Sequence, residues 1–314
     1  MFSIKRDRVL FLFLLLTNLG IVSQITIGGI TRVTGSGDGC PDWPTCFGKW
    51  IPPLEYHALI EYSHRSVGTI VGIFTLFICL RIFFKHRNNK ALINISLMLL
   101  SIIIIVGLLG GAVVLTELNP AIRTIHLMLA EITVLISVTT LIIFLDTGKK
   151  PIPHKRKWIF FNISKEYEKY FIGMFFSSFL ILITILSGSY AVWTNAGFYC
   201  PSWPLCGREA IIPVQTLEII HMLHRLLSLF SVIITGYFFY KILRIRNISN
   251  VIKIVTSLGF GVILTQIIWG ALVPLSNFSE WSRAGHLSIA TILWTIVILL
   301  TNLMKNPRIF PVKL

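Results

Sequence analysis

Long apolar runs separated by short polar links dominate the sequence. A run of about 20 apolar residues is long enough to cross the roughly 30 Å hydrocarbon core of a bilayer as a helix. The pattern therefore predicts eight transmembrane helices, over residues 9–29, 59–84, 92–115, 122–145, 171–194, 217–243, 251–275 and 284–303.

The composition supports this prediction. Hydrophobic residues make up 54% of the 314 residues, charged residues make up only 13%, and the mean hydropathy is +0.79. A soluble domain has about 25% charged residues, so this chain lacks the polar residues to cover a water-exposed surface. We predict an all-α integral membrane protein surrounded by the lipid bilayer.

Basic residues indicate which side of the membrane is cytoplasmic. The net charge is +15, but we expect no nucleic-acid partner because the charge follows the links between helices. The N-terminus, the links 81–90, 146–170 and 241–253, and the C-terminus hold 3, 4, 7, 4 and 3 of the 28 Lys and Arg residues. The positive-inside rule then places both termini in the cytoplasm and the links 31–58 and 195–216 outside. The expected location is the cell inner (plasma) membrane.

The chain contains an internal repeat. Residues 40–46 read CPDWPTC, and residues 200–206 read CPSWPLC. The same offset of 160 residues maps His64-Arg65 onto His224-Arg225, Gly110 onto Gly270, Arg123 onto Arg283 and His126 onto His286. We therefore predict two pseudo-symmetric four-helix bundles related by duplication. They would span residues 1–147 and 171–314, with 148–170 as a basic cytoplasmic linker.

The four repeated histidines are candidate metal ligands. A single histidine in a membrane helix is more often a helix-end residue that is hydrogen-bonded to a neighbour. Four of them, paired by duplication, favour two imidazoles on facing helices that bind one metal ion in each bundle. No cysteine–histidine or carboxylate cage accompanies them, which counts against zinc and calcium. Haem fits best, because it needs two axial nitrogens in an apolar bundle.

Each repeated histidine has an arginine nearby. Arg65 and Arg225 directly follow a histidine, and Arg123 and Arg283 precede one by three residues, on the same helix face. Arginine pairs well with carboxylates such as haem propionates. The alternative is that these arginines reach towards lipid headgroups. We predict two haem sites, one in each half of the chain.

Four of the five cysteines lie in the predicted outer loops as Cys40, Cys46, Cys200 and Cys206. Disulfides persist on the oxidising side of the membrane, so we predict the pairs Cys40–Cys46 and Cys200–Cys206. Both a structural role and a redox role remain open for these pairs.

The two halves differ at one acidic position. Glu61 lies one helical turn before His64, and its repeat equivalent is His221. A carboxylate at membrane depth is costly and usually functional. Glu61 could act as a base, stabilise a cation or relay protons, or it could simply form an ion pair with Arg65 or Arg123. The first half is thus the expected place for chemistry, and the second half for holding a cofactor.

The motifs together resemble those of the haem A synthase family. They are GGITRVTGSG (28–37), CPDWPTC, IEYSHR (60–65), HMLHR (221–225) and the helices that carry His126 and His286. The resemblance implies an oxidoreductase that converts haem O to haem A for aa₃-type cytochrome oxidases. A methyl group of haem O would be hydroxylated twice, and the resulting geminal diol would lose water to give the formyl group.

The resemblance also implies roles for particular residues. His224 and His286 would bind a haem b cofactor, with Arg225 and Arg283 near its propionates. The substrate haem would lie between His64 and His126, with Arg65 and Arg123 near its propionates, and Glu61 would be catalytic. The implied partners are haem O synthase and an unknown electron donor, and a homo-oligomer is compatible with the family. Glu131 and His221 receive no role.

Two other functions compete with this one. A dihaem b-type electron-transfer subunit that oxidises quinol would hold two equivalent haems and would not need Glu61. A transporter of haem or a small anion would show broken helices with polar residues near the midplane. The histidines and arginines cluster instead at one end of the predicted helices, which ranks the transporter third.

Overall fold

The computed structural model describes residues 7–147, 156–158, 161–163, 167–207, 215–246 and 248–305. Eight helices in this part of the chain are long and apolar enough to cross a membrane. They are α1 (Arg8–Val33), α2 (Tyr56–Lys85), α3 (Lys90–Leu115), α4 (Pro120–Asp146), α5 (Glu168–Trp193), α6 (Thr216–Leu243), α7 (Asn250–Leu275) and α8 (Glu280–Lys305). The prediction of an all-α, multi-pass membrane protein is confirmed.

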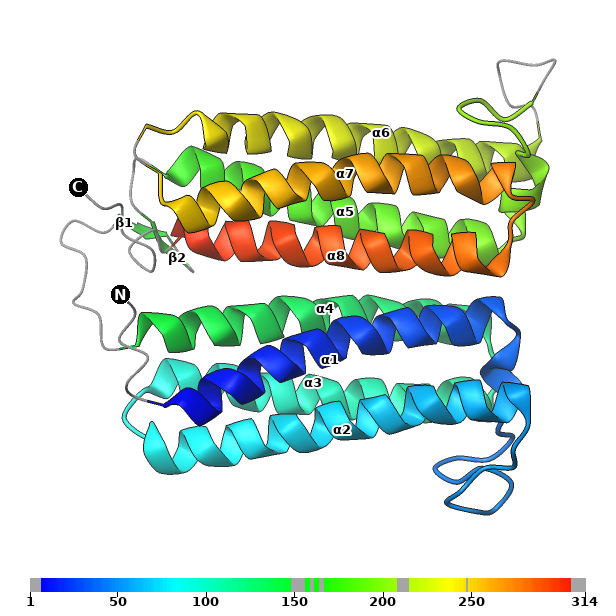
Figure 1. Cartoon of the computed structure of the whole chain (residues 1–314), viewed down its shortest axis with the longest axis horizontal. Helices are drawn as coiled ribbons and strands as arrows, with labels where there is room; N and C mark the ends of the chain where they lie inside the picture. The colour runs from blue at the N-terminus through cyan, green and yellow to red at the C-terminus, as the bar shows by residue number, and fades with distance from the viewer. Residues whose placement is uncertain are drawn as a thin grey trace. The chain divides into compact units, whose positions relative to one another are not determined.

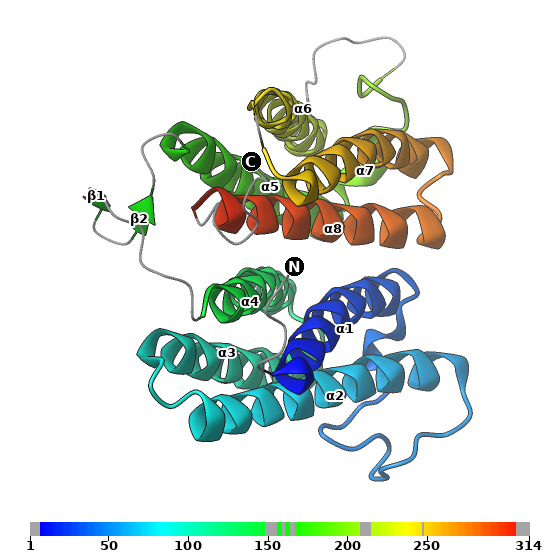
Figure 2. The ribbon, with the colours of Figure 1, turned by 60° about the vertical axis from the view of Figure 1, so that its left-hand side comes forward.

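The chain divides into two compact units, Met1–Thr147 and Gly148–Leu314. Each unit contains a bundle of four helices (Figures 1 and 2). In the first unit α1 packs against α2 and α4, and α3 packs against the same two helices; α5 to α8 repeat this arrangement in the second unit. Thus α2 and α4 lie at opposite corners of one bundle, and α6 and α8 at opposite corners of the other.

Helix boundaries recur at the offset seen in the sequence. Helices α1, α3 and α4 begin at residues 8, 90 and 120, and α5, α7 and α8 begin 160 residues later, at 168, 250 and 280. This recurrence is consistent with duplication. A short 3-10 helix, Ser36–Asp38 in the first unit and Ala196–Tyr199 in the second, follows α1 and α5.

The link between the units contains more structure than the sequence predicted. Two three-residue strands, β1 (Arg156–Trp158) and β2 (Phe161–Ile163), pair antiparallel. Helix α5 begins at Glu168, three residues before the predicted start of the second bundle. Strands this short carry no usable alternation of apolar and polar residues, so the pattern of the link could not reveal them.

Polar residues in the links determine where several helices begin. Asp7, Asn89 and Ser249 each accept a hydrogen bond from the backbone N–H three residues later, and Asn119 caps α4 with Pro120 at its first position. These caps satisfy backbone donors that would otherwise remain unpaired at a helix end.

An ion pair between Asp7 and Arg81 lies at the end of the first bundle opposite the loop that contains Cys40 and Cys46. The Asp7 carboxylate accepts hydrogen bonds from Arg81 Nε at 2.9 and 3.0 Å and from Arg81 Nη2 at 2.7 Å. Burial raises the pKa of Asp7, but hydrogen bonds from Arg81, the Leu10 amide and His86 outweigh it and leave the pKa below its ordinary value. Residues before α1 and near the end of α2 are thereby tied together.

Candidate functional site

Both predicted disulfides form, Cys40–Cys46 and Cys200–Cys206. We call residues 40–46 the first disulfide loop and residues 200–206 the second. Each loop contains a cis peptide bond before its second proline, at Trp43–Pro44 and Trp203–Pro204. The two loops therefore share the disulfide spacing and the position of the cis peptide bond.

Asp42 organises the first disulfide loop from within. Its carboxylate accepts hydrogen bonds from the Thr45 hydroxyl, from the Phe47 amide at 2.5 Å and from the Gly48 amide at 2.9 Å. The hydrogen bond from Thr45, followed by those from the two amides, lowers the pKa of Asp42 below its ordinary value. The repeat position holds Ser202, so the second loop lacks this anion.

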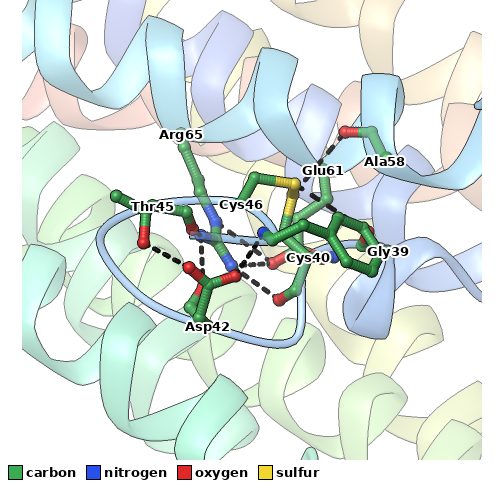
Figure 3. Close-up of polar contacts among 9 residues, drawn as sticks. Gly39, Cys40, Asp42, Thr45, Cys46, Ala58, Glu61 and Arg65 are labelled. Atoms are coloured by element: carbon green, nitrogen blue, oxygen red, sulfur yellow. Dashed lines mark hydrogen bonds and ion pairs between the residues drawn. A yellow bond between two sulfur atoms is a disulfide. The ribbon is translucent and has the colours of Figure 1, made fainter. Parts of the chain in front are cut away.

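The Glu61 carboxylate is buried under the first disulfide loop, with 3% of the residue exposed. Its Oε2 accepts a hydrogen bond from the Cys40 amide at 2.7 Å, and its Oε1 accepts bonds from Arg65 Nη2 at 2.5 Å and Nε at 3.2 Å (Figure 3). The ion pair with Arg65 that the sequence left as an alternative is present. Both carboxylate oxygens are therefore held in place by donors.

Arg65 is the centre of this network. Besides binding Glu61, it donates to the carbonyls of Asp42 at 2.7 Å and Thr45 at 2.5 Å from Nη1, and to that of Cys40 at 3.0 Å from Nη2 (Figure 3). A guanidinium has five N–H donors, and these contacts use all of them. Binding a haem propionate would require Arg65 to break one of these bonds, so that role stays a prediction.

Arg225 holds the second disulfide loop in the same way. Its Nη1 donates to the carbonyls of Pro204 and Leu205, each at 2.9 Å, and its Nη2 donates to that of Cys200 at 3.0 Å. Among the described residues no carboxylate is seen to bind Arg225, and His221 stands at the position of Glu61. The other two candidate arginines, Arg123 and Arg283, are half-buried in the first turns of α4 and α8, and their propionate role also stays a prediction.

All four repeated histidines pack against glycines on neighbouring helices. A Cβ atom added to Gly28 would lie 2.8 Å from His64 Cε1, and one added to Gly110 would lie 3.3 Å from His126 Cε1. The second unit repeats these contacts, with Gly188 against His224 at 2.8 Å and Gly270 against His286 at 3.1 Å. Gly28 and Gly110 thus leave room for an imidazole ring between neighbouring helices.

The geometry of the second pair fits two ligands of one metal ion. The His224 and His286 rings come from α6 and α8, at opposite corners of the bundle, and their centroids lie 6.4 Å apart. Imidazole nitrogens lie about 2 Å from a bound metal, and the ring centre lies about 1 Å further, which gives roughly 6 Å between two axial rings. Within the described residues no cluster of three or more His, Cys, Asp or Glu side chains forms a metal cage. A haem, whose macrocycle supplies the remaining ligands, fits this donor set.

Three polar side chains that the sequence reasoning missed lie next to these imidazoles. Gln24 Nε2 is 3.4 Å from His64 Nε2, Ser187 Oγ is 2.9 Å from His224 Nδ1, and Gln266 Nε2 is 3.3 Å from His286 Nδ1. The two glutamines are conspicuous as amides inside apolar runs, which is the signal that could have found them. His221 also stacks near His224, with ring centroids 6.4 Å apart.

Comparison with known proteins assigns the family. The family described as Cytochrome oxidase assembly protein (COX15-CtaA) matches residues 11–298. The chain belongs to this family. The matched region contains both disulfide loops, Glu61 and all four histidines, so family membership covers the whole candidate site and confirms the resemblance seen in the motifs.

Three relatives that align with nearly the whole chain are named Heme A synthase. The Heme A synthase of Geobacillus thermodenitrificans is 27% identical over 299 residues, which cover 93% of this chain and 90% of that protein. The Heme A synthase of Geobacillus kaustophilus (strain HTA426) is 27% identical over 304 residues, with coverage of 95% and 92%. That of Halalkalibacterium halodurans is 26% identical over 305 residues, with coverage of 96% and 99%.

Proposed function

We propose that this protein is a haem A synthase, which oxidises a methyl group of haem O to the formyl group of haem A in the cell's inner membrane, with both termini in the cytoplasm. The observation that carries the proposal is a repeated placement of histidines on two helices of each unit, with a buried, fully hydrogen-bonded carboxylate, Glu61, beside them in only one copy. Relatives named Heme A synthase that span nearly the whole chain support the same activity.

In this proposal the first unit binds the substrate. Haem O would lie between His64 and His126, and Glu61 lies one helical turn from His64 on the same helix. Glu61 is shielded from solvent, and the Cys40 amide and Arg65 hold its two oxygens. A carboxylate held in this way can stabilise positive charge that develops on the substrate methyl carbon, or accept a proton from attacking water.

The second unit holds the cofactor in this proposal. His224 and His286 would bind haem b, which would supply one-electron transfer when it is bound. His221 stands at the repeat position of Glu61 there, so this unit lacks the group assigned to the methyl chemistry. Haem O synthase is the proposed supplier of the substrate.

Co-expression with a source of haem O, followed by chromatography of the extracted haems, tests the function. We expect haem A from the wild-type protein, and only haem O and haem b from the Glu61→Gln variant. Glutamine keeps an acceptor for the Cys40 amide but cannot hold the negative charge. Wild-type protein that is purified with haem b alone, and that yields no haem A at any level of haem O supply, would instead identify an electron-transfer cytochrome and overturn the proposal.

A further inference from the structure

We propose that the hydrogen-bond partners of the imidazoles determine which unit keeps its haem and which exchanges it. Ser187 and Gln266 would make the second unit a retention site, and Gln24 would make the first unit an exchange site. The inference rests on the proposed function in one respect, that each unit binds a haem between its two histidines. It assigns positioning roles to three residues that have no role in the proposal above.

Ser187 fixes the tautomer of His224. The Ser187 hydroxyl donates its hydrogen to the Thr184 carbonyl at 2.8 Å, so its oxygen is left to accept from His224 Nδ1 at 2.9 Å. The hydrogen of His224 is thereby placed on Nδ1, and the lone pair on Nε2 is available for a metal ion. Gly188, the next residue, packs against the same ring and leaves the space that the ring occupies.

Gln266 lies next to the Nδ1 atom of His286, as Ser187 lies next to that of His224. Its amide lies 3.3 Å from His286 Nδ1, and its Oε1 is buried without a hydrogen-bond partner. The oxygen and nitrogen of an amide exchange places by rotation about one bond, and with Oε1 towards the ring the amide oxygen can accept the hydrogen of His286 Nδ1. The Nε2 lone pair of His286 is then also available.

The first unit has neither support. At an offset of 160 residues, Ser187 corresponds to Ile27 and Gln266 to Val106, whose side chains cannot accept a hydrogen bond. The Nδ1 atoms of His64 and His126 are accordingly buried without a side-chain partner, and among the described residues only the backbone of Gln24 and of Val106 lies within reach of these rings. His64 instead has its Nε2 next to the Gln24 amide. At the position of Gln24 the second unit has Thr184, whose hydroxyl bonds to the Leu180 carbonyl and to Ser231.

These differences predict different haem lifetimes. A partner on the second ring nitrogen orients a ligating imidazole and raises its basicity, and losing that partner costs roughly 10–100-fold in metal affinity. In the first unit, a bond from His64 Nε2 to iron must also replace its contact with Gln24. A site that receives haem O and releases haem A has to exchange its haem, whereas a cofactor site must not.

The loss of haem from purified holoprotein to an excess of apomyoglobin tests the inference. We expect Ser187→Ala and Gln266→Leu each to release the haem of the second unit about 10–100-fold faster than wild type. Ser178→Ala is the matched control, because Ser178 also lies on α5 and also donates to a carbonyl three residues earlier. Ser187→Thr, which keeps the hydroxyl, should restore retention and the visible spectrum of a haem with two histidine ligands.

Variants that transfer the second-unit partners to the first unit test the inference even if a loss variant misfolds. Ile27→Ser combined with Val106→Gln copies the second-unit partners into the first unit, and Gln24→Thr removes the competing amide. We expect the haem added to the first unit to dissociate at least 10-fold more slowly from either variant. Unchanged dissociation in both loss variants and both exchange variants would overturn the inference. These rates do not depend on turnover, so a protein that makes no haem A would refute the proposed function and leave this inference standing.

Discussion

Removing Arg65 should open the first disulfide loop while leaving the second one closed. Arg65→Met deletes five hydrogen bonds: three to loop carbonyls and two to the Glu61 carboxylate. Methionine keeps much of the apolar stem, so the change isolates the polar contacts. The matched variant is Arg225→Met, which deletes three bonds to carbonyls of the second loop, where His221 replaces Glu61.

The size of the effect follows from burial. Removing one partner of a buried ion pair costs about 3–5 kcal/mol, because the other charge remains unpaired. The side chains of Arg65 and Glu61 are 13% and 4% exposed, so solvent reduces this cost to about 2–3 kcal/mol for the closed loop. At 1.4 kcal/mol for each factor of ten, the open population rises roughly 30–150-fold. Arg225→Met should have a smaller effect, about 10-fold or less, because only bonds to neutral carbonyls are lost.

The rate at which a membrane-impermeant reductant cleaves each disulfide measures loop opening. Thiol labelling followed by mass spectrometry reads Cys40–Cys46 and Cys200–Cys206 in the same molecule, so each loop is the internal reference for the other. We expect Arg65→Met to accelerate cleavage of Cys40–Cys46 alone. Glu61→Gln combined with Arg65→Met should recover part of the loss, because no buried charge is left unpaired. Equal cleavage rates for the two disulfides in Arg65→Met would refute the reasoning.

Three further predictions concern charge and packing. The pKa of Asp42 is lowered in the folded loop, so the Asp42 carboxylate stabilises the loop fully above the ordinary pKa of 3.8. This stabilisation is lost as the pH falls through the lower folded-state pKa. Trp43 fluorescence should show this acid transition in wild type and not in Asp42→Asn. Asp7→Asn keeps the helix cap but removes the charge that faces Arg81, and should lower the free energy of unfolding by about 2 kcal/mol near neutral pH. The difference from wild type should shrink as the pH falls through the lowered pKa of Asp7. Thermal unfolding in detergent at pH 7 and below pH 3 checks this. Gly28→Ala places a methyl group 2.8 Å from His64 Cε1 and should displace that ring; titration with haem should then show weaker binding in the first unit, with the second unit unaffected.

The large-scale features were predictable from the sequence because they depend on composition and periodicity. Eight apolar runs gave eight helices, and the caps at Asp7 and Asn89 explain why α1 and α3 start one or two residues before the runs do. The cysteine pairs followed from spacing within one loop. Each of these features is local in the chain, so no knowledge of helix rotation was needed.

The partners of the site residues were not predictable in the same way. Arg65 was expected near a propionate, but a loop that lies 20–25 residues earlier in the chain folds back over α2 and takes its donors. The contacts of Gln24, Ser187 and Gln266 with the histidines depend on how each helix is rotated about its axis. The internal repeat also drew attention away from these three residues, because each has a different residue type at its repeat position.

The contrast between the two loops leads to one last prediction, that copying the acid does not copy the chemistry. His221→Glu places a carboxylate at the repeat position of Glu61, and Arg225 could pair with it. The Cys200 amide, however, already donates to the Gly197 carbonyl at 3.1 Å, whereas the Cys40 amide donates to Glu61. The new carboxylate would therefore lack the second donor that holds Glu61 in place. In a Glu61→Gln background, we expect His221→Glu to restore no haem A in extracted haems. Restored haem A would mean that the amide is dispensable and that an acid paired with arginine suffices in either unit.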